Sequence, residues 1–150
     1  MTTSPRGFTL LIALIVTSVL VSVGLALVDV AYKQLLLSST AKSSQIAFYN
    51  ADAALECGLY YDQKFNAFSQ AIATSSIRCA GQTVSVTGSN AGNVRTSTFT
   101  IPCAGGSSAR VTVLKNTTGA SNIYANGYSS CSATDPRRVE RGLKITYSGL

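Results

Sequence analysis

An apolar segment from Phe8 to Val28 limits what this chain can fold into more than any other feature of its 150 residues. The segment contains neither a charged residue nor a proline. A helix of about 20 residues, rising ~1.5 Å per residue, is long enough to cross the roughly 30 Å hydrocarbon core of a bilayer. We therefore predict a membrane-spanning helix over residues 8–28, preceded by a polar leader over residues 1–7.

Three kinds of N-terminal segment fit this composition: a secretory signal peptide, an uncleaved single-pass anchor, and an anchor whose leader is removed in front of the helix. A signal peptide has a shorter apolar core and a small-residue cleavage site behind it. The sequence offers only the weak candidate Gly24-Leu25-Ala26 for such a site. The order RGFTLL, with Gly7 directly before Phe8, favours the third kind.

The same residues carry a family likeness, because RGFTLL after a polar leader resembles the prepilin processing site of type IV pilins and pilin-like proteins. The resemblance implies that a prepilin peptidase cuts after Gly7 and that Phe8 becomes a methylated N-terminus. It also implies that the apolar helix later packs with other pilin subunits inside a filament. The filament-core residues expected on this basis are Phe8, Leu10, Leu11, Ile12, Leu14, Ile15 and Val16.

A second likeness lies in AFYNADAALECGLYYD, residues 47–62. It resembles the segment that follows the membrane helix in minor pilins of the PilX class, and its end, ECGLYYD, resembles short pilin-like proteins of small-genome bacteria. Major type IV pilins carry a glutamate at the fifth residue after the cut, where this chain has Ile12. The K pseudopilin of type II secretion systems, a tip subunit, is similar in lacking this acid. The resemblance therefore implies a minor or tip subunit.

The helix is expected to continue beyond the membrane segment to about Tyr61, because no proline interrupts residues 8–61. After Asp29 its pattern becomes amphipathic, with apolar or small residues mostly three or four positions apart at Leu37, Ala41, Phe48, Ala51, Leu55 and Leu59. The polar residues occupy other faces, and we interpret Asp52, Glu56 and Asp62 as its solvated side.

Residues 62–150 are predicted to form a β-rich head. Short β-branched runs separated by Gly, Asn, Ser and Pro indicate antiparallel strands joined by turns. A short helical turn is expected near Phe65 to Ala73. The candidate strands are 83–87, 94–101, 109–115, 122–128 and 139–147, with a turn at 88–92 between the first two. We predict an α+β fold of the pilin kind, in which the helix (membrane part 8–28, amphipathic part 29–61) packs on a meander of four to five strands.

The four cysteines, Cys57, Cys79, Cys103 and Cys131, all follow the apolar segment, and their even number indicates two disulfides in an oxidising compartment. Sequence leaves three pairings open; we favour neighbours, Cys57 with Cys79 and Cys103 with Cys131. Each bond would then close a loop worth on the order of 3 kcal/mol. A zinc site is the competing interpretation, but the cysteines lie more than ~20 positions apart without C-x-x-C pairs, so we expect no metal.

Charge and residue types narrow the function classes. The chain has no histidine and only six acidic residues, so a Ser/His/Asp or Cys/His arrangement cannot form, and we expect neither an enzyme nor a cofactor. The net charge is +6, and basic residues gather near the C-terminus at Arg137, Arg138, Arg141 and Lys144. These four are a candidate patch for nucleic acid or another partner, although a solvated face is the plainer interpretation.

The sequence therefore predicts a structural subunit of a type IV pilus or pilus-like filament, inserted in the membrane with its head outside and later part of an extracellular filament. The expected partners are other pilin subunits, the prepilin peptidase and the pilus assembly machinery, the membrane before assembly, and DNA or a host-cell surface. Two alternatives stay open: a DNA-binding pilin of an uptake machine, and a monomeric membrane-anchored surface or adhesin domain. Sequence does not separate adhesion, motility, secretion and DNA uptake.

Overall fold

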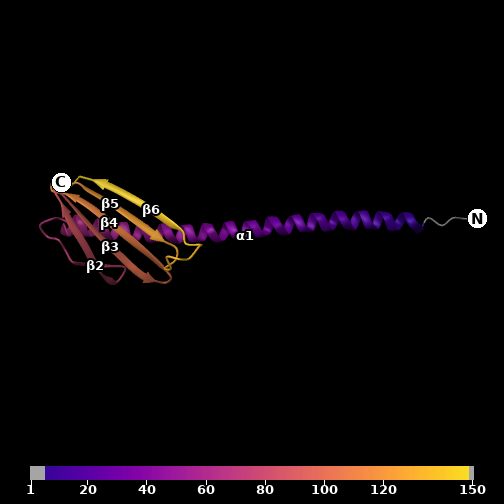
Figure 1. Ribbon diagram of the computed structural model, residues 1–150, viewed down its shortest axis with the longest axis horizontal. Coiled ribbons are helices and arrows are strands. Elements are labelled where there is room, and N and C mark those ends of the chain that lie inside the picture. Colours follow the sequence, from indigo (N-terminus) through magenta and orange to yellow (C-terminus); the bar gives the residue numbers. More distant parts are fainter. Residues whose placement is uncertain (1–5, 149–150) are drawn as a thin grey trace, which may run out of the picture. The chain divides into compact units, whose positions relative to one another are not determined.

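The computed structural model describes the fold of residues 6–148 and has an α+β architecture, with one helix and six antiparallel strands (Figure 1). The predicted leader, residues 1–7, lies for the most part outside the described residues. The chain divides into two compact units, Met1–Ser39 and Thr40–Leu150. The predicted boundaries at residues 28 and 61 differ from this division, and each unit is described by itself below.

Helix α1 covers Arg6–Phe65 and ends four residues beyond the predicted Tyr61. Its end is a left-handed cap: Asn66 has φ 51°, and its N–H donates to the carbonyl of Asp62 at 3.0 Å. Asparagine tolerates this conformation better than most residues, and the bond satisfies a carbonyl that the helix leaves open. The segment after it, where a short helical turn was expected near 65–73, contains hydrogen-bonded turns, among them one from Ala73 N–H to the Ser69 carbonyl at 3.0 Å.

The sheet is a simple meander in which each strand pairs with the next along the chain. Its strands are β1 (Ser76–Cys79), β2 (Gln82–Ala91), β3 (Val94–Ala104), β4 (Ser107–Asn116), β5 (Ser121–Tyr128) and β6 (Glu140–Tyr147). The prediction of four to five strands was therefore one strand short, because it missed the short edge strand β1. Ser76–Cys79 alternates exposed and buried residues, but it is only four residues long and contains a single aliphatic side chain, Ile77, so its sequence pattern is too short to stand out.

Tight glycine turns join the first four strands. Ala80 and Gly81 both have positive φ between β1 and β2, as do Gly105 and Gly106 between β3 and β4, which is the arrangement of two-residue hairpins. The turn between β2 and β3 lies at Gly92, not across residues 88–92 as predicted. The predicted turn included Gly88, but this glycine lies within β2, where it pairs with Ser97 of β3.

One face of the sheet is buried against the part of α1 that begins at Thr40 (Figure 1). The helix presents small side chains there, and Ala47, Ala51 and Ala54 are fully buried. Alternate residues of the central strands complete the core with Phe99, Val111, Val113, Ile123 and Ala125. Along β4 the buried residues Val111, Val113 and Lys115 alternate with the partly exposed Thr112 and Leu114.

Helix and sheet approach each other closely at Gly127 of β5. A Cβ atom on this glycine would collide with the backbone of Ala47 and Ala51. Gly58, one turn further along α1 than Ala54, has more room, since a Cβ there would meet Val111 at an ordinary 3.4 Å. Small residues on both sides therefore let the two backbones pack together and bury the apolar strand residues between them.

Candidate functional site

The exposed apolar surface of α1 is the first candidate site. All seven predicted filament-core side chains are exposed, from Ile12 at 45 % to Leu10 at 72 %. Among residues 6–148, α1 alone is long and apolar enough to cross a membrane. Soluble proteins rarely leave so much contiguous apolar surface uncovered, so this segment requires lipid or other protein around it.

Polar groups inside the apolar segment are satisfied by the helix itself. The hydroxyls of Thr17, Ser18 and Ser22 each donate to the carbonyl three residues earlier, at 2.8–3.0 Å. In hydrocarbon, an unsatisfied hydroxyl would cost free energy, and local bonds of this kind remove that cost. The Gly7–Phe8 bond, where processing is predicted, lies in the first helical turn of the described chain.

Asp62 forms a second site that the sequence analysis missed. Its interpretation as part of the solvated helix side was wrong, because only 2 % of the residue is exposed. Lys115 Nζ donates to Oδ1 at 2.7 Å, Ser121 Oγ donates to Oδ2 at 2.7 Å, and the Tyr147 hydroxyl also donates to Oδ2. Asp62 lies four residues after Gly58, which places it on the side of the helix that the structure buries, but the sequence pattern did not identify that side at this position.

This network links the end of α1 to three strands. Burial, followed by the hydrogen bond to the Asp62 carboxylate, raises the pKa of the Tyr147 hydroxyl above its ordinary value. A pocket of about 740 Å³ borders the network and is lined mostly by amides and hydroxyls, among them Gln63, Asn66 and Thr117. Both carboxylate oxygens already accept hydrogen bonds, so the cluster serves as a polar lock between helix and sheet.

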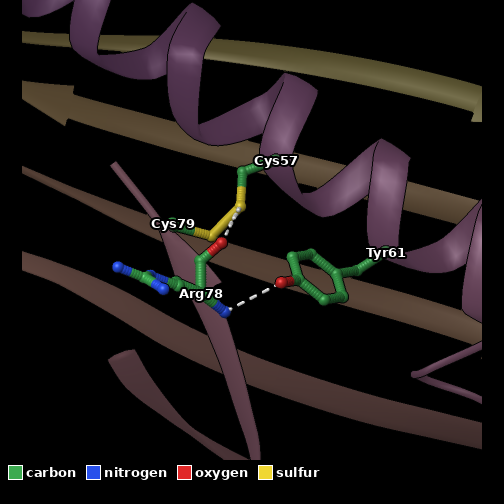
Figure 2. The surroundings of a disulfide bond; sticks show 4 residues. All are labelled: Cys57, Tyr61, Arg78 and Cys79. Atoms are coloured by element: carbon green, nitrogen blue, oxygen red, sulfur yellow. Dashed lines mark hydrogen bonds between the residues drawn. A yellow bond between two sulfur atoms is a disulfide. The ribbon is translucent and has the colours of Figure 1, made fainter. Parts of the chain in front are cut away.

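The two disulfides join the cysteines in the favoured pairing, Cys57–Cys79 and Cys103–Cys131, with Cα–Cα distances of 6.0 and 5.8 Å. Figure 2 shows the first, between α1 and the end of β1. Beside it the Arg78 N–H donates to the Tyr61 hydroxyl at 3.0 Å, so α1 holds the edge strand through a covalent bond and a hydrogen bond. Cys103 and Cys131, in contrast, are both exposed.

The structure divides the predicted basic patch. Arg141 lies on the helix side of β6, where its Nε donates to Ser44 Oγ at 2.8 Å. Lys144 lies on the opposite face, above the ring of Tyr124. The expectation of one four-residue patch was therefore wrong, because residues three apart in a strand point to opposite faces.

The two loop arginines of the predicted patch have separate surroundings. The Arg138 guanidinium lies 3.8 Å from the centre of the Tyr128 ring. The Arg137 N–H donates to Asp135 Oδ1 at 2.9 Å, and this bond, together with a hydrogen bond from Ser130, lowers the pKa of the Asp135 carboxyl. Arg138 therefore joins Lys144 in covering tyrosines of the uncovered side of the sheet, whereas Arg137 belongs to a local turn.

Comparison with known proteins does not assign this chain to a family. No family model matches the chain, and no curated protein and no solved structure matches it. The function must therefore be argued from the residues and the fold.

Proposed function

We propose that this protein is a structural subunit of a type IV pilus-like filament, cleaved after Gly7 and assembled by packing of its apolar N-terminal helices. The observation that carries the proposal is the uncharged, exposed segment of α1 that begins directly at Phe8, after a polar leader. Such a helix is stable in lipid before assembly. In a filament, neighbouring helices of the same kind would replace the lipid.

The fold supports this proposal in two further respects. A single helix supplies both the apolar segment and, from Thr40 onward, the buried stripe that holds the sheet. The head has two disulfides, which stabilise small domains outside the cytoplasm. We propose on the same grounds that the head faces outward from the membrane and that the mature protein is extracellular.

Ile12 makes a minor or tip position the preferred form of this proposal. A carboxylate at this place in an apolar filament core would need a positive partner, because an unpaired buried charge costs several kcal/mol. Ile12 needs none, so this subunit does not depend on an amine from a neighbour. A tip subunit is expected at about one copy per filament, a number that quantitative mass spectrometry of sheared filaments can measure.

Processing is tested by expressing the full chain with and without a prepilin peptidase and determining the N-terminus by mass spectrometry. We expect loss of residues 1–7 and a methylated Phe8 when the peptidase is present. Gly7→Val should abolish the cleavage, whereas Gly24→Val, a matched change inside the apolar helix, should not. An intact initiating methionine on mature surface protein would contradict the proposal.

Assembly is tested separately, since a monomeric anchored surface domain would also have an apolar helix. Single cysteines placed between residues 10 and 25 should give ladders of crosslinked multimers in cells that produce the filament. Monomers alone would favour the anchored domain. A DNA-binding role receives less support, because Arg141 lies on the opposite side of the sheet from Lys144.

A further inference from the structure

The side of α1 that faces away from the sheet carries a stripe formed by Tyr49, Asp52, Glu56 and Tyr60, here called the helix stripe. Its two tyrosine rings pack edge-on only against aromatic neighbours of α1 itself, among the described residues. The spacing of three or four residues places the four stripe residues on one side, opposite the buried residues Ala47, Ala51, Ala54 and Gly58. Tyr49 is 69 % exposed and Tyr60 is 55 % exposed. Asp52 and Glu56 form no ion pair within residues 6–148. The helix stripe therefore offers two aromatic rings and two uncompensated carboxylates.

The face of the sheet turned away from α1, here called the outer sheet face, has the opposite charge. Thr98, Thr112, Tyr124 and Lys144 form one row across its strands, and Arg110 lies next to Asn126 in the neighbouring row. Arg78 adds a third cation on β1, and Arg138 a fourth above Tyr128. Glu140 is the single acidic residue among the strand positions of this face, and it accepts a hydrogen bond from Asn126 at 2.6 Å.

We propose that the outer sheet face of one subunit docks on the helix stripe of a neighbouring copy of this chain. The charges are complementary, since Arg110 and Lys144 would meet Asp52 and Glu56, and the tyrosines of the helix stripe would pack on the threonine rows. Such a contact joins two different surfaces, and a contact of that kind propagates into an open helical filament when the rotation does not close. The inference rests on the filament function proposed above and assigns it a contact between heads.

A second copy fits the outer sheet face better than nucleic acid does. The two tyrosines of this face that could stack on bases already have a cation above the ring, Arg138 at 3.8 Å over Tyr128 and Lys144 at 5.1 Å over Tyr124. Base stacking would have to displace both cations. The helix stripe, in contrast, is a complement of matching sign present on every copy, and charge complementarity sets the register between two protein surfaces.

The contact is tested with a photo-crosslinking residue, benzoyl-phenylalanine, in place of Tyr124 of the full chain in the cells that produce the filament. We expect crosslinked dimers whose joined peptides contain residues 49–60. Crosslinks between two outer sheet faces would overturn the proposal. Crosslinks that form only after addition of duplex DNA, and to that DNA, would assign the face to nucleic acid and overturn it as well.

Charge reversal provides a second, independent test. Glu56→Arg and Arg110→Glu should each lower the yield of the dimer crosslink roughly tenfold, and the double variant should restore most of it, because the pair is then reversed and still complementary. Thr118→Glu and Thr118→Arg, in the exposed turn between β4 and β5, are controls for added charge and should leave the yield unchanged. Failure of the double variant to recover would count against this pairing.

The two proposals fail in distinguishable ways. If cysteines between residues 10 and 25 give ladders while the photo-crosslinker gives no contact with residues 49–60, the filament function stands and the head contact is wrong. If neither gives multimers, both are wrong.

Discussion

Lys115 and Asp62 form an ion pair across the helix–sheet boundary, with Lys115 Nζ 2.7 Å from Asp62 Oδ1. The carboxylate side chain is fully buried, and the lysine side chain is 11 % exposed. Two long-range hydrogen bonds, from Ser121 and Tyr147, complete the shell of Asp62. Because the pair is buried, removing one partner leaves the other charge without compensation.

Asp62→Asn should therefore destabilise the head by about 3–5 kcal/mol, since Lys115 would stay buried without a counter-charge. The measurement is urea unfolding of the full chain in detergent micelles, followed by near-ultraviolet circular dichroism. Asp52→Asn, the same chemical change on the side of α1 away from the sheet, should change the free energy of unfolding by less than about 0.5 kcal/mol. Equal stabilities for the two variants would show that the buried pair is not important.

Ionisation of Tyr147 should lower the stability of the head at alkaline pH. In the folded head, burial and the hydrogen bond to Asp62 raise the pKa of its hydroxyl, whereas in the unfolded chain the pKa of a tyrosine is about 10. The unfolded state therefore loses this proton first. The contribution to stability is complete below about pH 10 and is lost as the pH rises above it.

The ionisation of Tyr147 can be followed directly by ultraviolet absorbance of tyrosinate. Tyr147 should ionise late, together with unfolding of the head. Tyr147→Phe should remove this late step and make the free energy of unfolding less dependent on pH above about 10. Tyr49→Phe is the control and should retain the late step; a late step that survives in Tyr147→Phe would disprove the assignment.

Gly127→Ala should destabilise the head by about 3 kcal/mol, because the new methyl group meets the backbone of Ala47 and Ala51, which cannot move as a side chain can. Gly58→Ala is the matched control. Its methyl group would make ordinary contacts, and alanine gains up to about 1 kcal/mol of helix propensity over glycine. Thermal unfolding should therefore rank Gly58→Ala at or above the unmodified chain and Gly127→Ala well below it. The reverse order would contradict the observed packing.

The two disulfides should differ in their susceptibility to reductant. Cys79 is 1 % exposed, whereas Cys103 and Cys131 are exposed. A thiolate attacks a disulfide only where it can reach a sulfur atom, so Cys103–Cys131 should be reduced first. Timed dithiothreitol treatment, followed by alkylation and peptide mass spectrometry, checks the order. Loss of Cys57–Cys79 before the other bond would refute the prediction.

Removal of each disulfide in turn measures the contribution of that bond to the free energy of unfolding. The bonds span 22 and 28 residues, so replacement of either pair by serine should cost about 3 kcal/mol by loop entropy. The Cys57/Cys79 variant should additionally release β1, because that edge strand is short and is held to α1 at this point. Hydrogen exchange at residues 76–79 would detect the release, and the Cys103/Cys131 variant serves as its control.

The local pattern of apolar, polar and turn residues was sufficient to predict much of the fold. The apolar run, the change to an amphipathic pattern and the β-branched runs between turn residues are local patterns of the chain itself, and they predicted the helix and most strands. The separation of Arg141 from Lys144 also follows from strand parity. This separation could have been predicted once residues 139–147 were taken as a strand. The four basic residues were instead grouped because they are close together in the sequence.

The sequence by itself determined the apolar helix, the order of its two halves and the antiparallel meander, because these depend on repeats of two to about four residues and on nearby turn glycines. Only the tertiary structure decided that Asp62 is buried, since its partners Lys115 and Tyr147 lie 53 and 85 residues further along the chain. The same holds for the edge strand β1, whose four residues are placed by pairing with β2 and by the bond from Cys79 to α1. The physical reason is that burial of a charge and pairing of a short strand are favourable only through contacts with distant residues, and no local pattern records those contacts.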